Sequence, residues 1–262
     1  MKKIIFTALL MVLLIPVLLV MLLSVFSYYK YPQLLPTLFT LNYWQHLLFA
    51  NSLFWEGLMN SMVIGALNAI AATIIGLMTG RALTRYAFRG KKILLLFFSL
   101  PLFIPSMALF IGIHMMMIRL ALINTYLGVI IAHMIISIPY ATNISMSFFQ
   151  GISRNMEDVA RTLGCTNKNL FIKIMAPLMM PGILLSLSIC FLLSFSEYFS
   201  VFLVGGGKII TLSMVMFPYI SNSDYGNGAA ISLVFMMVNL GVFFIADFVI
   251  RKKTKERHYL YD

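Results

Sequence analysis

The chain has very few charged residues. Only 10% of its 262 residues are Asp, Glu, Lys or Arg, against about 25% in an average soluble domain. A soluble domain of this length needs more polar side chains to cover its surface, so that class is excluded. Disorder is excluded as well, because disordered segments are poor in hydrophobic residues, whereas 61% of these residues are hydrophobic.

Cysteine and acidic residues are also scarce. Two cysteines, Cys165 and Cys190, cannot form a disulfide framework. Their expected places, a cytosolic loop and a membrane span, predict two free thiols. The chain has 8 acidic residues against 19 basic ones and a net charge of +11. Such an excess can serve nucleic-acid binding, but in a membrane protein it is typical of cytoplasmic loops, and we expect no nucleic-acid partner.

Long apolar runs are what the chain has instead. Helices of about 20 apolar residues cross a bilayer, and the continuous rather than alternating pattern excludes a barrel. We therefore predict an all-α membrane protein, with residues 1–262 as one transmembrane domain in the lipid bilayer. Its six predicted spans are residues 4–26, 57–80, 93–118, 125–149, 182–204 and 228–250.

The first apolar stretch is longer than that of a signal peptide. No small-x-small cleavage site follows it, so we interpret it as a retained helix. Prolines inside this and other predicted spans are expected to kink them. These are Pro16, Pro101, Pro105 and Pro139.

The basic residues predict the orientation. With the N-terminus in the cytosol, 16 of the 19 basic residues lie inside: two before the first span, five after the second, four in residues 150–181 and five in the tail. Only Lys30, Arg119 and Lys208 then lie outside. This asymmetry predicts a multi-pass protein with both termini in the cytosol.

Motifs for catalysis are missing. Gly205-Gly206-Gly207-Lys208 resembles part of a phosphate loop, but Ile209 replaces the Ser or Thr that holds magnesium, and Phe202 replaces the first Gly. His114 and His133 lie in different spans, without an H-E-x-x-H pattern. We predict no catalytic residue and no metal site.

The predicted cytosolic loop 150–181 contains two short amphipathic helices. The first starts at Asn155 as N-cap, carries acids in its first turn and stops at Gly164, which takes a left-handed conformation. The second is capped by Thr166 and ends before Pro177. The chemistry of the residues leaves two alternatives open: a hairpin lying on the membrane surface, or an element that docks a partner.

A signature in this loop resembles that of ABC importer permeases, which reads Glu-Ala-Ala, three residues, Gly, nine residues, Ile, one residue, Leu-Pro. The spacing agrees throughout, and Ala160, Gly164, Ile174 and Pro177 match by identity. Three positions differ: Asp158, Val159 and Ala176. Glu157 offers an acid one residue earlier.

Other segments extend the resemblance over most of the chain. Residues 85–91 resemble the basic loop after the second core helix, and residues 124–140 resemble the next helix. Within the superfamily, the chain is most similar to the second permease of polyamine-type importers. That branch includes systems for 2-aminoethylphosphonate, thiamine, iron and oxyanions.

The resemblance implies a type I importer fold and a non-enzymatic subunit of the bacterial plasma (inner) membrane that forms half of a solute path. It implies three partners: a cytosolic ATPase dimer, a second, homologous but different permease chain, and an extracytoplasmic solute-binding protein. ATP and magnesium would be held by the ATPase, and this chain would bind no cofactor. The residues that it assigns to the ATPase-coupling loop are Glu157, Asp158, Val159, Ala160, Leu163, Gly164, Ile174 and Pro177.

The substrate is expected to be a small polar solute of the polyamine, aminophosphonate, thiamine or iron and oxyanion class. Glu197 is a carboxylate at membrane depth, which is costly unless it faces protein or a cavity. It is a candidate for contact with a cationic substrate. The alternative is that it forms a hydrogen bond with a neighbouring helix or gates the path. Asn143 and Tyr198 are further candidates for the path.

Two other functional classes stay open at this point. A stand-alone secondary transporter or channel would work without an ATPase, and a membrane scaffold would need no water-accessible path. Several polar residues inside spans are expected to serve helix contacts rather than ligands. These are Asn60, Asn68, His133, an Asp247–Arg251 pair one turn apart and, as the alternative to its place in the path, Asn143.

Overall fold

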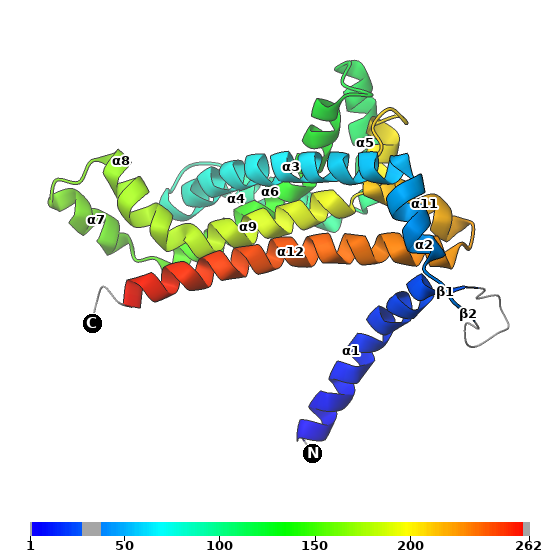
Figure 1. Cartoon of the computed structure of the whole chain (residues 1–262). Helices are drawn as coiled ribbons and strands as arrows, with labels where there is room; N and C mark the ends of the chain where they lie inside the picture. Colours follow the sequence, from blue (N-terminus) through cyan, green and yellow to red (C-terminus); the bar gives the residue numbers. More distant parts are fainter. Residues whose placement is uncertain (1, 28–37, 259–262) are drawn as a thin grey trace. The chain divides into compact units, whose positions relative to one another are not determined.

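The computed structural model describes residues 2–27 and 38–258, most of which are helical (Figure 1). Two-residue strands β1 (Phe26–Ser27) and β2 (Leu38–Phe39) pair antiparallel. Lys30, expected in an outer segment, lies outside the described residues. The helices are α1 (Lys2–Val25), α2 (Asn42–Gln45), η1 (His46–Ala50), α3 (Ser52–Arg85), α4 (Lys91–Phe103), α5 (Ser106–Arg119), α6 (Tyr126–Gly151), α7 (Arg154–Thr162), α8 (Asn167–Asn169), η2 (Leu170–Met175), α9 (Ala176–Ser196), α10 (Phe199–Val204), α11 (Leu212–Ser221) and α12 (Tyr225–His258).

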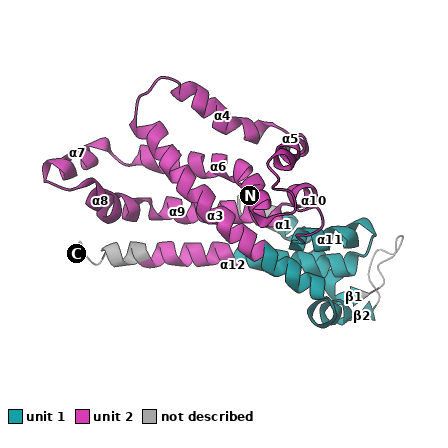
Figure 2. Cartoon of the chain, turned by 90° about the horizontal axis from the view of Figure 1, so that it is seen from above, with its two compact units in different colours: residues 1–60, 210–240 teal, residues 61–209, 241–262 magenta. Residues whose placement is uncertain are grey.

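The chain divides into two compact units (Figure 2). The first contains residues 1–60 and 210–240. Inside it, Asn60 on α3 donates a hydrogen bond to the carbonyl of Ile210 at 2.8 Å, and Asn51 donates one to the Tyr219 hydroxyl at 3.1 Å. Asn60 therefore makes a structural contact, but its partner lies in the segment before α11 and not in a helix, where it was expected.

The second unit contains residues 61–209 and 241–262. Helices α3, α6 and α9 pack together here, and small residues let the first two approach closely. A Cβ atom placed on Gly76 would lie 2.5 Å from Cβ of Ala141, and one on Gly80 would lie 2.6 Å from Cβ of Ser145. These two glycines therefore serve helix packing.

Four described stretches are long and apolar enough to cross a membrane: Ser52–Arg85, Tyr126–Gly151, Asn167–Ser196 and Tyr225–Lys252. They correspond to the second, fourth, fifth and sixth predicted spans. Helix α1 corresponds to the first. Near the end of α12, Arg251 Nε lies 2.6 Å from Asp247 Oδ2, which confirms that predicted pair.

The third predicted span, 93–118, is wrong as a single helix. It divides into α4 and α5 at Ile104 and Pro105. Proline disfavours helical dihedrals in the residue before it, and Ile104 is extended, with φ −81° and ψ 131°. The fifth predicted span is also interrupted, because Glu197 is extended between α9 and α10. The short helices α2, α10 and α11 were not predicted.

Candidate functional site

The predicted cytosolic loop forms two helical elements at one end of the α6–α9 pair (Figure 1). The first element, α7, starts one residue before the predicted Asn155. Its N-cap is Ser153, in an extended conformation and without a side-chain capping bond, so the predicted Asn155 cap is wrong. The reason is tertiary: Arg154 donates a hydrogen bond to the carbonyl of Thr84 on α3 at 2.8 Å, which fixes the first residue of α7 against that helix.

The end of α7 confirms the prediction for Gly164, whose φ is +82°. The Gly164 N–H donates to the carbonyl of Arg161 at 2.9 Å, and the Cys165 N–H donates to that of Ala160 at 3.0 Å. These two bonds form a Schellman motif, which satisfies the last carbonyls of a helix. The turn into the second element is therefore set by the local sequence.

The second element is capped as predicted but does not end as predicted. Thr166 Oγ1 accepts a hydrogen bond from the Asn169 N–H at 3.3 Å. The helix then continues past Pro177, because the π-helical turn η2 leads directly into α9 and Pro177 lies in the first turn of α9. A π turn shifts the hydrogen-bond register, so the missing N–H of proline does not interrupt the helix there.

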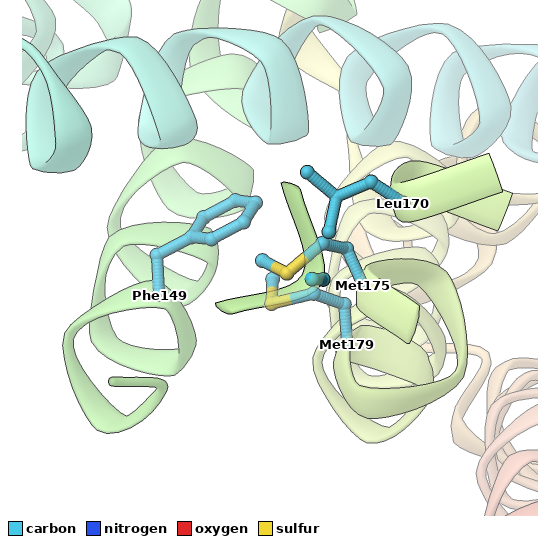
Figure 3. Close-up of a cluster of buried hydrophobic side chains, with 5 residues drawn as sticks. Phe149, Leu170, Met175 and Met179 are labelled. Atoms are coloured by element: carbon cyan, nitrogen blue, oxygen red, sulfur yellow. The ribbon is translucent and has the colours of Figure 1, made fainter. Parts of the chain in front are cut away.

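A small hydrophobic cluster lies where the two elements meet the ends of α6 and α9 (Figure 3). Only one of its side chains, Ala160, comes from α7. The others belong to α6, η2 and α9: Phe149, Leu170, Met175 and Met179.

Two arginines at the end of α3 hold the acid of α7. Glu157 Oε1 lies 2.7 Å from Arg85 Nε, and Glu157 Oε2 lies 3.3 Å from Arg81 Nη2. Glu157 is 8% exposed, so its carboxylate is nearly withdrawn from water. We call these three residues the arginine clamp. In the sequence, these two arginines indicated only which side of the membrane the loop occupies, and their pairing with Glu157 was not predicted. Their i, i+4 spacing does place both on one face of the helix.

Each arginine of the clamp also has a second contact. The Arg81 guanidinium carbon lies 5.8 Å from the ring centre of Phe171 on η2. That of Arg85 lies 5.9 Å from the ring centre of Phe149 on α6. Arg85 in addition donates a hydrogen bond to the carbonyl of Ile152 at 2.9 Å.

The residues assigned to the coupling loop separate into inward and outward groups. Glu157 and Ala160 are buried, while Val159 is 58% and Leu163 is 82% exposed. Asp158, Gly164 and Pro177 are exposed or half-exposed, and Ile174 is half-buried. The apolar side chains of Val159 and Leu163 are therefore not covered by any other described part of this chain.

A second candidate site lies at the break between α9 and α10. Glu197 Oε1 accepts hydrogen bonds from the N–H groups of Phe199 and Ser200, at 3.1 and 3.3 Å, and so caps α10. The same residue lines a small cavity of about 80 Å³ together with Phe110, His133, Ile136, Ser137, Leu193, Ser194 and Ser196.

The other residues proposed for the path are placed differently. Tyr198 stacks on Phe202, with ring centres 5.8 Å apart. Asn143 is exposed on α6 and does not line the cavity. His133 Nδ1 lies 2.6 Å from Ser194 Oγ, so this histidine links α6 to α9, as expected for a helix contact.

Comparison with known proteins decides the family. The model of the family described as "Binding-protein-dependent transport system inner membrane component" matches residues 72–255. The chain belongs to this family. Stand-alone transporters, channels and scaffolds are thereby set aside.

Relatives of this permease are named for different solutes. The molybdate/tungstate transport system permease protein WtpB of Pyrococcus abyssi is 28% identical over 198 residues, which are 75% of this chain and 79% of the relative. The spermidine/putrescine transport system permease protein PotC of Haemophilus influenzae is 22% identical over 209 residues, 80% of this chain and 81% of the relative.

A solved structure agrees on the fold. A chain of a bacterial alginate ABC transporter, in complex with an alginate pentasaccharide-bound periplasmic protein, superposes with a TM-score of 0.69 at 16% identity, covering 97% of this chain and 98% of that one. The chain is thus a non-catalytic permease subunit of an ABC importer with the type I fold.

Proposed function

We propose that this permease forms half of a solute path and couples it to a cytosolic ATPase pair through residues 150–181. The observation that carries the proposal is the construction of α7. Its end is fixed by the Schellman motif and its acid is held by the arginine clamp, while Val159 and Leu163 point outward, 58% and 82% exposed. A rigid helix with uncovered apolar side chains is suited to a groove on another protein.

The proposed cycle uses this helix as a rigid body. When ATP closes the ATPase pair, the coupling elements move together and the path changes from inward-open to outward-open. The driving free energy is the difference in nucleotide affinity between the two states. ATP and magnesium belong to the ATPase in this scheme.

The remaining partners complete the importer. A second, homologous permease chain forms the other half of the path, and a solute-binding protein docks on the extracytoplasmic side. The subunit lies in the bacterial plasma membrane with both termini in the cytosol. The distribution of 16 of 19 basic residues supports this orientation.

The proposed substrate is a small polar solute. The cavity beside Glu197, with His133, Ser137 and Ser194 in its walls, supports this class because its lining offers several hydrogen-bonding groups. A carboxylate there favours a cationic solute such as a polyamine. Tyr198 and Asn143 are proposed as residues further along the path.

The coupling assignment is tested at Leu163. We expect Leu163→Glu to leave membrane insertion intact, because this side chain is 82% exposed, and to abolish retention of the ATPase when the permease is purified. Leu120, 52% exposed in the turn after α5, provides the matched control Leu120→Glu, which should retain the ATPase. Equal retention in both variants would contradict the proposal.

A further inference from the structure

We propose that Arg81, Arg85 and Glu157 act as a positioning clamp, which makes α7 move with the cytosolic end of α3. This inference rests on the proposed coupling function. It assigns Glu157 a role inside the permease rather than on the ATPase surface. The two neighbouring acids then have different roles: Glu157 binds within the permease, and the exposed Asp158 is available to a partner.

The first argument is the burial of Glu157. Its side chain is 10% exposed, and its two oxygens are directed at two different arginines of α3, at 2.7 and 3.3 Å. A buried carboxylate is tolerated when it is paired and hydrogen-bonded. An acid used in this way is not available to an incoming protein surface.

The second argument is that α7 has little else to hold it. Glu157 and Ala160 are the buried residues of this nine-residue helix. Alanine buries little apolar area, so hydrophobic packing alone fixes the helix weakly. The hydrogen bonds from Arg81 to Glu157 and from Arg154 to the Thr84 carbonyl supply directional contacts with α3, and the Arg85–Glu157 ion pair adds charge attraction.

The third argument is that the clamp connects several segments at once. Arg81 contacts α7 through Glu157 and η2 through the ring of Phe171. Arg85 contacts α7 through the same carboxylate, and the end of α6 through Phe149 and the Ile152 carbonyl. A displacement of α7 is therefore passed to α3 and to both flanking elements.

The charge balance of the clamp predicts that its variants differ in the size of their effect. Two guanidinium groups share one carboxylate, so loss of Glu157 leaves two neighbouring cations without their anion. Loss of Arg81 leaves the shorter Arg85–Glu157 pair in place. Removing one partner of a buried pair is damaging because the other charge stays behind unpaired. Glu157→Gln does this to two arginines and Arg81→Ala keeps one of the two pairs, so we expect Glu157→Gln to act more strongly.

The functional consequence differs from the loss of a docking contact. Without the clamp, Val159 and Leu163 still face outward and the ATPase stays bound, but its movement is no longer passed to α3. We expect the Glu157→Gln transporter to hydrolyse ATP without corresponding uptake. A docking residue would instead lose the ATPase altogether.

The test is hydrogen–deuterium exchange of residues 153–165 in the full-length permease purified in detergent. We expect exchange in Glu157→Gln to be at least about tenfold faster than in the wild type, with a smaller increase in Arg81→Ala. Asp247→Asn is the matched control, because it removes an ion pair of 2.6 Å that is exposed on α12. It should leave the exchange of residues 153–165 unchanged.

A charge exchange separates the clamp from a general folding defect. The double variant Glu157→Arg with Arg85→Glu restores opposite charges but loses the Arg85 bond to the Ile152 carbonyl. It should therefore recover part of the protection and of the uptake relative to Glu157→Arg alone. Unchanged exchange in Glu157→Gln, or no recovery in the double variant, overturns the clamp. Failure of the wild-type permease to retain an ATPase overturns the proposed coupling function instead, so the two failures are distinguishable.

Discussion

Asn68 on α3 donates a side-chain hydrogen bond to the hydroxyl of Ser137 on α6, at 2.9 Å, with both residues fully buried. The same amide nitrogen lies 3.0 Å from the carbonyl oxygen of Cys190 on α9. One side chain thereby connects the three packed helices of the second unit. Hydrogen bonds between membrane helices contribute about 0.6 kcal/mol on average, and up to about 2 kcal/mol.

The first prediction concerns this junction. Asn68→Leu should lower the free energy of unfolding by about 1 kcal/mol, because the partner groups on α6 and α9 lose their donor. Thermal unfolding of the purified permease in detergent measures it. Asn239→Leu is the control, since Asn239 donates to the Phe235 carbonyl within its own helix, at 2.9 Å. An equal decrease of the unfolding temperature in both variants would show that the hydrogen bonds of Asn68 add no stability beyond the difference in helix propensity between Asn and Leu.

The second prediction concerns the turn after α7. Gly164→Val should strain a backbone position with φ of +82°, at a cost of about 1–2 kcal/mol. We expect normal insertion with reduced uptake and reduced ATPase retention. Gly151→Val is the matched control, because Gly151 lies in the same region with open space around it and without a positive φ. Wild-type uptake in Gly164→Val would mean that the loop is an ordinary surface hairpin.

The third prediction separates two roles of Glu197. Glutamine keeps an oxygen that accepts from the Phe199 and Ser200 N–H groups, whereas alanine keeps neither the oxygen nor the charge. If the charge serves a cationic solute, both Glu197→Gln and Glu197→Ala reduce uptake by about tenfold or more, while ATPase retention is unchanged. Loss of uptake in the alanine variant alone would assign Glu197 to capping α10 and not to the solute.

The fourth prediction concerns topology. Reporter fusions at Arg89 and Lys168 should be cytosolic, and a fusion at Lys208 should be extracytoplasmic, because this arrangement leaves three of the 19 basic residues outside. Alkaline phosphatase and fluorescent-protein fusions show on which side of the membrane each position lies. An extracytoplasmic signal at Lys168 would defeat both the orientation and the coupling assignment.

Properties set by neighbouring residues could be predicted from the sequence. The membrane helices α3, α6 and α12 can be recognised from the composition of each segment alone. In a bilayer, each helix has to form all its backbone hydrogen bonds within itself. The left-handed Gly164 and the Thr166 cap follow from single residues beside their helix ends. In each case the information lies within a few positions of the feature.

Features that depend on distant segments were missed. The carboxylate of Glu157 pairs with Arg85 and with Arg81, which is 76 positions earlier in the chain. No pattern among neighbouring residues predicts a pairing over that distance. Helix α7 starts earlier than predicted because Arg154 reaches α3. The predicted helix end before Pro177 is wrong because local rules do not foresee the π turn that precedes this proline.

That π turn has a mechanical consequence. Because it joins α8 to α9 without a break, residues Asn167–Ser196 form one stretch of 30 helical residues, about 45 Å long at 1.5 Å per residue. Its first residue follows the turn after α7, and its last residue precedes Glu197. In the proposed cycle, a movement of the loop would be carried along this one helical stretch, which contains Pro181, to the residue beside the polar cavity.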